Sequence, residues 1–357
     1  MIGRGRGRSA ASGTSHSRSG DGRDPVYAAV DLGTNNCRLL IARPVLNGFK
    51  VIDAFSRIVR LGEGLERDGR LSEAAVMRTI EALRICAEKM RRRGVTHARN
   101  VATEACRRAS NGALFLSRVA SETGLAFEII APDEEARLAM AGCASLLDPR
   151  IPYALLFDIG GGSTEIIWLA ASGGNAQMLA SMSLPVGVVG FAERYGGYQV
   201  DGDAYDAMVA AVDAALAPFD AAHGISAAIS RGMVQMLGTS GTITTIAGVH
   251  LELPRYDRSV VDGCYLPFDT VQQVVARLRA MSYEERKAHP CVGYERADLV
   301  IAGLAILEGI CRSWQVGRLR VADRGLREGI LLGLMQAQRP APDRGEDVAL
   351  ALAPARP

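Results

Sequence analysis

The sequence has no apolar run approaching the roughly 18 residues that a membrane-spanning helix requires. Nor does an apolar segment follow the arginines near its start, so we expect no secretory signal. The 41 basic and 39 acidic residues leave a formal net charge of only +2, which gives no general attraction to nucleic acid. We therefore expect a cytoplasmic protein whose partners include neither a membrane nor nucleic acid.

The residue patterns of several common catalytic and metal sites are also missing. The seven cysteines include no CxxC pair, and none lies near a histidine at zinc-ligand spacing, so we expect free thiols in a reducing compartment. There is no Walker A loop and no GxSxG nucleophile motif. No histidine has an acid and a nucleophile in motif spacing. Carboxylates and glycine-rich loops remain as the candidates for chemistry.

The chain contains one pattern twice, in YAAVDLGTNNCRLLI and in YALLFDIGGGSTEIIW. Each copy is an apolar run, an aspartate, an aliphatic residue, a glycine, a polar loop, a charged residue and a second apolar run. Arg38 follows Asp31 at the same interval at which Glu165 follows Asp158. The repeat predicts two related domains that face each other across a cleft.

Each aspartate leads into a turn that is typical of phosphate and metal binding. Glycine allows a tight turn in which successive backbone N–H groups converge on an anion. Thr34, Asn35 and Asn36 add side-chain donors in the first copy. Asp31 and Asp158 would repel a phosphate, so their expected role is to hold Mg²⁺ or an attacking water beside it. The alternative is a tight hairpin in which the aspartate satisfies its own turn.

A third candidate anion loop is the sequence GTSGT at residues 238–242, which contains Ser240 and Gly241. It follows an apolar strand and opens a helix, so its amide donors and the helix dipole would point the same way. The alternative is that GTSGT is an ordinary loop that binds no anion, since glycine, threonine and serine are common in loops.

Three acidic residues and one arginine are further candidates. Glu134 and Glu135 lie in the first turn of a predicted helix, where acids commonly complement the helix dipole. That helix leads directly into the second repeat, so a carboxylate at its start could instead accept a proton from water that attacks phosphorus. Glu165, on the second hairpin, is a candidate metal ligand or water holder. Arg107 could pair with phosphate oxygens.

Strands and helices alternate along the chain, which predicts an α/β fold. Ser72 and Gly94 are the predicted cap and end of a helix over residues 72–93. The final helices are free to pack back on the first domain. We divide the chain into a disordered Gly/Ser/Arg-rich tail (1–24), a first domain (25–147), a second domain (148–338) and a frayed tail (339–357).

Eight elements, in order, resemble the exopolyphosphatase and guanosine pentaphosphate (pppGpp) phosphohydrolase family. The DIGGGSTE element is the most specific of them. The resemblance implies two duplicated actin-like (ribonuclease H-like) domains around a central cleft. The elements are Asp31-LGTNNCRLLI, Thr103-EACRRASN, Glu134-EARLAMAG, Asp158-IGGGSTE, Ser183-LPVGVV, Gly238-TSGT, Tyr294-ERADLVIAGLAILE and Gly325-LREG.

The resemblance also implies hydrolysis of terminal phosphoanhydride bonds with Mg²⁺ or another divalent cation. Its general base would be the second glutamate of the EEAR element, Glu135, with Glu134 as the alternative. Asp158 and Glu165 would be the metal and water carboxylates, and Arg107 a phosphate contact. The implied phosphate cradle consists of Gly33, Thr34, Asn35, Gly161, Gly162, Ser163, Ser240 and Gly241.

We expect an exopolyphosphatase, and a pppGpp 5′-phosphohydrolase is the alternative within the same class. Outside that class, the candidates are a kinase of the actin superfamily, which would require ATP as donor, and a non-hydrolytic polyphosphate or nucleotide sensor. Retention of Glu135 and Glu165 argues against a sensor, because a pure binder gains nothing from negative charge beside phosphate. Gly190 stands where the family commonly has an arginine, which removes one expected phosphate contact. The resemblance makes a homodimer the candidate assembly.

Overall fold

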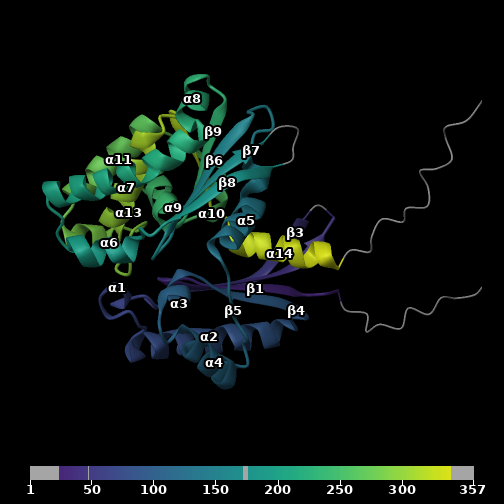
Figure 1. Ribbon diagram of the computed structural model, residues 1–357. Coiled ribbons are helices and arrows are strands. Elements are labelled where there is room, and N and C mark those ends of the chain that lie inside the picture. The colour runs from purple at the N-terminus through teal and green to yellow at the C-terminus, as the bar shows by residue number, and fades with distance from the viewer. Residues whose placement is uncertain (1–23, 47, 172–175, 339–357) are drawn as a thin grey trace, which may run out of the picture.

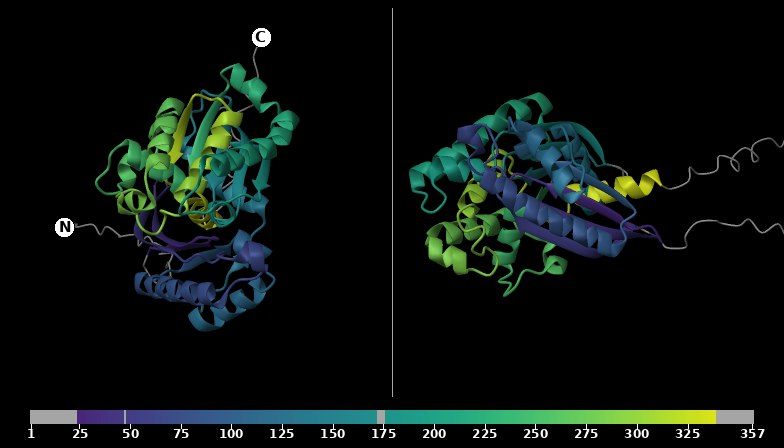
Figure 2. Two further views of the ribbon diagram at one scale, coloured as in Figure 1. Left: turned by 90° about the vertical axis from the view of Figure 1, so that its left-hand side faces the viewer. Right: turned by 90° about the horizontal axis from the view of Figure 1, so that it is seen from below.

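The computed structural model describes residues 24–46, 48–171 and 176–338, so apart from Asp24 the two predicted tails lie outside the described residues. Figure 1 shows two lobes, each built on one twisted sheet with helices packed against it. The left-hand view of Figure 2 shows the C-terminal helix, in yellow, lying between the lobes.

The first lobe contains a five-stranded sheet in the order β3-β2-β1-β4-β5. Strands β1, β2 and β3 pair antiparallel, whereas β4 and β5 add in parallel. One face packs on helix α2, where Val30 and Leu39 meet Ile80 and Leu83 in a common core. The strands are β1 (Tyr27–Leu32), β2 (Asn36–Val45), β3 (Gly48–Ile58), β4 (His97–Ala102) and β5 (Glu128–Ile129).

The second lobe repeats this order as β8-β7-β6-β9-β11 and adds the short antiparallel strand β10 beyond β11. The register also repeats, because Asp31 pairs with Arg38 across β1 and β2, and Asp158 pairs with Glu165 across β6 and β7. The strands are β6 (Tyr153–Ile159), β7 (Thr164–Ala170), β8 (Gln177–Leu184), β9 (Val234–Thr239), β10 (Tyr265–Pro267) and β11 (Arg318–Ala322).

The helices of the described residues cover the outer faces of the sheets and fill the space between the lobes. None of them is long and apolar enough to cross a membrane. They are α1 (Leu65–Asp68), α2 (Glu73–Arg93), α3 (Glu104–Arg108), α4 (Gly112–Thr123), α5 (Pro132–Cys143), the 3-10 helix Ala144–Leu146, α6 (Val188–Tyr195), α7 (Gly202–His223), α8 (Ile225–Ser230), α9 (Gly241–His250), α10 (Arg258–Val261), α11 (Phe268–Ala280), α12 (Tyr283–Ala288), α13 (Val300–Ser313) and α14 (Leu326–Ala337).

Helices α5 and α14 cross between the two sheets (Figure 1). Helix α5 packs on the second sheet, whereas α14, from the end of the described chain, packs on the first. Their backbones touch at two glycines: a Cβ on Gly142 would lie 2.0 Å from Gly325 O, and one on Gly329 would lie 2.0 Å from Leu138 O. The crossing therefore requires glycine at both positions. Since α5 packs on the second sheet and α14 on the first, the crossed pair holds the two lobes together.

The structure confirms the predicted α/β class and the pair of actin-like lobes around a cleft. The predicted helix cap is confirmed, since Ser72 Oγ accepts from Ala75 N and Gly94 ends α2 with φ 64°. Strands β8 and β10 were not predicted. Strand β8 has the mixed sequence QMLASMSL, and β10 has only three residues, so neither gives a clear period-two pattern.

Candidate active site

Both repeats fold into the same tight hairpin turn. Gly33 N donates to Asn36 O at 2.9 Å, and Gly160 N donates to Ser163 O at 2.9 Å. Each turn follows a buried strand, so the aspartate before it is delivered to the end of the sheet that faces the other lobe. The remaining amides of the turn are left for other partners.

The two turns meet across the cleft. A Cβ on Gly161 would lie 3.0 Å from Asn35 N, and a Cβ on Gly162 would lie 2.6 Å from Thr34 Oγ1. The glycines of the second turn thus let the first turn approach closely. An anion held by one turn would be in reach of the other.

A cavity of about 120 Å³ lies where the turns meet. It is lined by both lobes, so the crevice that the repeat predicts between Asp31 and Asp158 is present. Of the predicted site residues, all but Glu134 and Arg107 line it. These are Asp31, Gly33, Thr34, Asn35, Glu135, Asp158, Gly161, Gly162, Ser163, Glu165, Ser240 and Gly241.

The structure separates the two neighbouring glutamates at the start of α5. Glu135 lines the cavity, and its Oε2 is buried with no hydrogen-bond partner among the described residues. Glu134 instead forms an ion pair with Arg99, and 39% of its side chain is exposed. Only Glu135 is therefore placed to meet a ligand in the cavity.

The carboxylates in the cavity raise one another's pKa. Burial is the largest cause for Glu135, whose pKa lies well above its usual range, and the charges of Glu165 and Asp31 add to it. Burial and the charge of Glu165 also raise the pKa of Asp158, to about 7. Arg38 opposes these effects at both aspartates. A bound cation would relieve this repulsion.

Glu165 is buried and held on one side by hydroxyl groups. Its Oε1 accepts from Ser163 Oγ at 2.7 Å and from Ser183 Oγ at 2.9 Å. Burial raises the pKa of Glu165, and the two serine hydrogen bonds lower it. The hydroxyl proton of Ser163 is used in this bond, so its predicted contact to phosphate would come from its backbone.

The third predicted loop caps helix α9 at the cavity. Ser240 has φ 143° and its Oγ accepts from Thr242 N at 3.1 Å and Ile243 N at 3.3 Å. The hydroxyl acts only as acceptor in these bonds, so its own proton remains available to a ligand. Together with Gly241, it places the positive end of the α9 dipole at the cavity.

Arg107 lies behind the acidic wall of the cavity. Its Nη2 donates to Glu104 Oε2 at 2.6 Å and its Nη1 donates to Ile130 O at 2.7 Å, while Glu135 Oε2 lies 3.5 Å from Nη1. These contacts orient Glu104 and Glu135. A phosphate contact by Arg107 stays a prediction, and the contacts in the structure point to a supporting role.

The carboxylates of the cavity fit a Mg²⁺ ion that would be bound partly by the protein and partly by phosphate oxygens of the substrate. Within the described residues, no three His, Cys, Asp or Glu side chains are grouped closely enough to hold a metal alone. Mg²⁺ is usually bound by one or two carboxylates together with phosphate oxygens and water. Asp31 and Asp158 supply such carboxylates, and the charge of Asp31 helps to raise the pKa of Asp158, a repulsion that a bound cation would relieve.

A second cavity, of about 460 Å³, opens beside the first and shares Asp31, Asp158 and Ser240 with it. This volume falls in the range of about 300–1,000 Å³ that is usual for small-molecule sites. The two aspartates thus lie at the junction of the cavities.

The second cavity is lined by several arginines, three of which form no ion pair within the described residues. Arg38, Arg296 and Arg327 have no carboxylate within ion-pair distance among residues 24–46, 48–171 and 176–338, whereas Arg324 pairs with Asp262. Burial lowers the pKa of Arg296, and the nearby charge of Arg38 lowers it further. Guanidinium groups that are brought together and left outside ion pairs favour binding of an anion with several charges.

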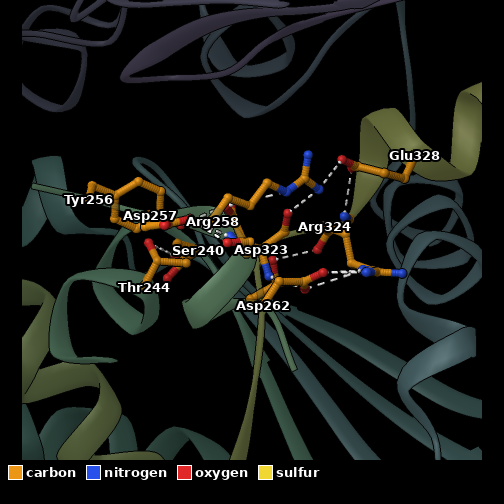
Figure 3. A network of polar contacts seen from close by, with 12 residues as sticks. Ser240, Thr244, Tyr256, Asp257, Arg258, Asp262, Asp323, Arg324 and Glu328 are labelled. Atoms are coloured by element: carbon orange, nitrogen blue, oxygen red, sulfur yellow. Dashed lines mark hydrogen bonds and ion pairs between the residues drawn. The ribbon is translucent and has the colours of Figure 1, made fainter. Parts of the chain in front are cut away.

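A polar network forms the wall of the second cavity (Figure 3). Tyr256 Oη donates to Asp323 Oδ2 at 2.5 Å, and Arg258 Nη2 donates to Glu328 Oε1 at 2.9 Å. The network ties the segment before α10 to the start of α14, so this wall is fixed to the helix that joins the lobes.

Four residues that line the cavities were not predicted from the sequence to have a role: Arg38, Glu104, Arg296 and Arg327. The repeat offered a signal for Arg38, because it occupies the position that Glu165 occupies in the second copy. Arg296 and Arg327 lie in elements that were quoted for the family resemblance, but nothing local distinguishes them from surface arginines. Their convergence depends on tertiary structure.

Comparisons with known proteins agree with the geometry. The sequence model of the Ppx/GppA phosphatase family matches residues 40–338. A crystal structure of an Aquifex aeolicus member of that family is similar with a TM-score of 0.72 and 28% identity, and the match covers 88% of this chain and 99% of that one. An exopolyphosphatase from Cytophaga hutchinsonii has the same fold, with a TM-score of 0.79, 23% identity, and coverage of 88% and 99%.

Proposed function

Because this chain belongs to the Ppx/GppA phosphatase family and is a hydrolase of phosphoanhydride bonds, we propose that it removes terminal phosphate groups from inorganic polyphosphate. The observation that carries the proposal is the single cavity in which two hairpin turns, carboxylates from both lobes and the N-terminus of α9 converge. Next to it, a larger cavity is lined by Arg38, Arg296 and Arg327, none of which forms an ion pair within the described residues. This arrangement suits a chain of phosphates whose end lies among the carboxylates.

In the proposed mechanism, the amides of the two turns and of α9 hold the oxygens of the terminal phosphate. Glu135 accepts a proton from the attacking water, because its carboxylate lines the cavity and its Oε2, 3.5 Å from Arg107 Nη1, accepts no hydrogen bond. Arg107 and Glu104 keep Glu135 in place. Asp31 and Asp158, with Glu165 nearby, would hold Mg²⁺, which would neutralise phosphate charge when bound.

The arginines of the second cavity would contact the remaining phosphates of the chain. A repeating anion presents a charge at every unit, so successive guanidinium groups can bind it without a specific shape. Arg296 and Arg327 are half-buried, which strengthens their attraction for an anion because less water screens it than at the open surface.

Hydrolysis of pppGpp to ppGpp is the second candidate, and Tyr256 favours it. Tyr256 lines the second cavity and 40% of the residue is exposed, so a purine base could pack against its ring. In that case the arginines would contact the 3′-diphosphate. The two candidates use the same cleavage site and differ only in what fills the second cavity.

The test is phosphate release by the purified protein with Mg²⁺, from tripolyphosphate, from long polyphosphate and from pppGpp. The proposal predicts free phosphate from both polyphosphates. Release from pppGpp alone would replace it by the second candidate. Phosphate transfer that requires ATP as donor would indicate a kinase, and binding without release would indicate a sensor.

We also propose a cytoplasmic location, supported by the seven free cysteines, of which six are buried and none is paired. A homodimer stays a prediction from the family resemblance. Light scattering on the purified protein would measure its mass.

A further inference from the structure

Residues 59–64, which we call the strap, connect β3 to α1 at the edge where the lobes approach (Figure 1). The strap is bound to the first hairpin turn through its backbone. Arg60 N donates to Asn35 O at 3.0 Å, and Gly62 N donates to Thr34 O at 2.9 Å. Both carbonyls belong to the residues that face the second turn. A displacement of the strap would therefore displace the first turn.

The side chain of Arg60 reaches across to the second lobe. Its Nη1 donates to Asp298 Oδ2 at 2.6 Å and its Nη2 donates to Asp298 Oδ1 at 2.9 Å, and Nη2 also donates to Glu295 O at 3.2 Å. Only 10% of the Asp298 side chain is exposed. This two-pronged pair is better shielded from solvent than a surface ion pair, so it contributes more to holding the lobes together.

The backbone of Arg60 is strained, with φ 47°. A non-glycine residue in this region is uncommon and persists only where its surroundings impose it. Here the Asn35 carbonyl fixes the amide of Arg60, and Arg78 Nε donates to Val59 O at 3.1 Å from within the first lobe. Glycine would adopt the conformation more easily but would lack the guanidinium, so the contact with Asp298 accounts for arginine at this position.

Asp298 lies next to the active cavity, because residues close to it in the sequence line that cavity. Arg296, Leu299 and Val300, its near neighbours, all line that cavity. The backbone of Gly197 also packs against Asp298, since a Cβ on Gly197 would lie 2.3 Å from Asp298 O. Asp298 is thus held in the second lobe by close backbone packing, as the strap is held to the first turn by backbone hydrogen bonds.

We propose that Arg60 is a positioning residue for the phosphate-binding turn. Its pair with Asp298 holds the lobes closed, and the strap transmits that closure to Thr34 and Asn35. When the lobes separate, the first turn loses the support that keeps it opposite Gly161. This inference rests on the proposed phosphohydrolase function and names a residue that controls the geometry of its site.

A second ion pair across the lobes provides a matched control. Arg194 in α6 pairs with Glu66 in α1, and both side chains are exposed, at 56% and 38%. Neither residue donates or accepts a backbone hydrogen bond with the first turn. Loss of this pair removes an interlobe contact and leaves the strap in place.

The experiment compares Arg60→Ala, Asp298→Asn and Arg194→Ala in the full-length protein. Steady-state phosphate release gives kcat and KM, and hydrogen exchange measured by mass spectrometry follows the peptide that contains Thr34 and Asn35. We expect kcat of the first two variants to fall about tenfold or more, since small misplacements at a reacting centre are costly. We also expect faster hydrogen exchange in that peptide in Arg60→Ala and Asp298→Asn. In Arg194→Ala, kcat and the exchange rate should both stay near the wild-type values.

Wild-type kcat and wild-type exchange in Arg60→Ala and Asp298→Asn would overturn the proposal. An equal loss of kcat in Arg194→Ala would also overturn it, because the effect would then follow from losing any contact between the lobes and not from the strap. Circular dichroism identifies a variant that has not folded, and Asp298→Asn keeps the shape of the native side chain. If wild-type protein releases no phosphate, the proposed function fails, whereas the exchange comparison still tests the strap.

Discussion

At the scale of single residues, the site depends on which way a carboxylate faces. Glu134 and Glu135 are neighbours in the first turn of α5, where the helix dipole favours either acid equally. Successive helical residues point about 100° apart, so the two side chains take different directions. The structure places Glu135 at the cavity and pairs Glu134 with Arg99.

Glu135→Gln should fold normally and lose most phosphate release. One general base contributes roughly 10²–10⁴-fold to a rate, so we expect a loss of that order in kcat. The variant should be at least as stable as wild type, because the amide removes a carboxylate that burial and Glu165 disfavour. Phosphate release and thermal melting measure the two effects. Glu134→Gln is the control and should keep its activity; full activity in Glu135→Gln would refute the assignment.

Arg107→Ala tests whether this arginine supports Glu135 or contacts phosphate. Loss of its bonds would free Glu104 and Glu135, so we expect kcat to fall about tenfold or more while KM changes little. A direct phosphate contact would instead raise KM. Kinetics on tripolyphosphate distinguishes the two, and an increase in KM alone would return Arg107 to the predicted phosphate cradle.

At the scale of elements, the crossing of α5 and α14 decides how the lobes are joined. Helix α5 follows the strands of the first lobe in the chain but packs on the second sheet. Helix α14 follows the strands of the second lobe but packs on the first sheet. Their closest approach depends on the absence of a side chain at Gly142 and at Gly329. The two helices that join the lobes thus meet through backbone contact.

Gly329→Ala should destabilise the protein by about 1–3 kcal/mol, because the new methyl group would lie 2.0 Å from Leu138 O and the helices would have to separate. Gly333→Ala, on the same helix, is the control: its Cβ would meet nothing within 4 Å. The control should be slightly more stable than wild type, since alanine favours the helix. Urea unfolding measures both, and equal stability of the two variants would contradict the close contact.

Asp53 joins β3 to α2, and its contribution should depend on pH. Lys89 donates to it at 2.8 Å, and this bond with that of Arg93 lowers the pKa of Asp53 from 3.8 to about 2. A carboxylate with a lowered folded-state pKa stabilises the protein above about pH 4 and loses that effect as pH falls towards about 2. Asp53→Asn should therefore be less stable at neutral pH by about 1 kcal/mol or less.

The difference between Asp53→Asn and wild type should shrink between about pH 4 and about pH 2. Urea unfolding of both proteins across that range measures it. A difference that stays constant, or grows as the pH falls, would show that Asp53 contributes through something other than its charge.

At the scale of the whole molecule, the active cavity belongs to neither lobe. The first lobe supplies Asp31 and its turn, the second supplies Asp158, Glu165 and the start of α9, and Glu135 comes from a helix between them. A ligand that contacts both lobes would therefore favour the arrangement in which they lie against each other.

Removal of Mg²⁺ by a chelator should abolish phosphate release, and added Mg²⁺ should restore it. Imidodiphosphate with Mg²⁺ should raise the melting temperature, because a ligand at about 100 times its Kd stabilises by about 2.7 kcal/mol. Without Mg²⁺ the rise should be smaller, since the phosphates would then face the carboxylates unshielded. Thermal melting with and without chelator checks this. Phosphate release at the full rate in chelator would contradict the metal assignment.

The sequence by itself determined the local parts of this protein. The two aspartate hairpins, the glycine loop before α9 and the start of α5 follow from strand, turn and helix preferences over short stretches, so the repeat and its motifs predicted them. Most of the predicted cradle then lined one cavity, because both copies of the repeat end at the same edge of their sheets.

Only the tertiary structure decided which neighbouring glutamate faces the cavity, that Arg107 lies behind it, and that Arg38, Arg296 and Arg327 converge. It alone decided the pairing of Arg60 with Asp298, residues 238 positions apart. These features depend on the relative placement of two lobes and on helices that cross between them. Contacts between distant segments leave no periodic or spacing signal in the chain, since their energy comes from packing formed only after folding.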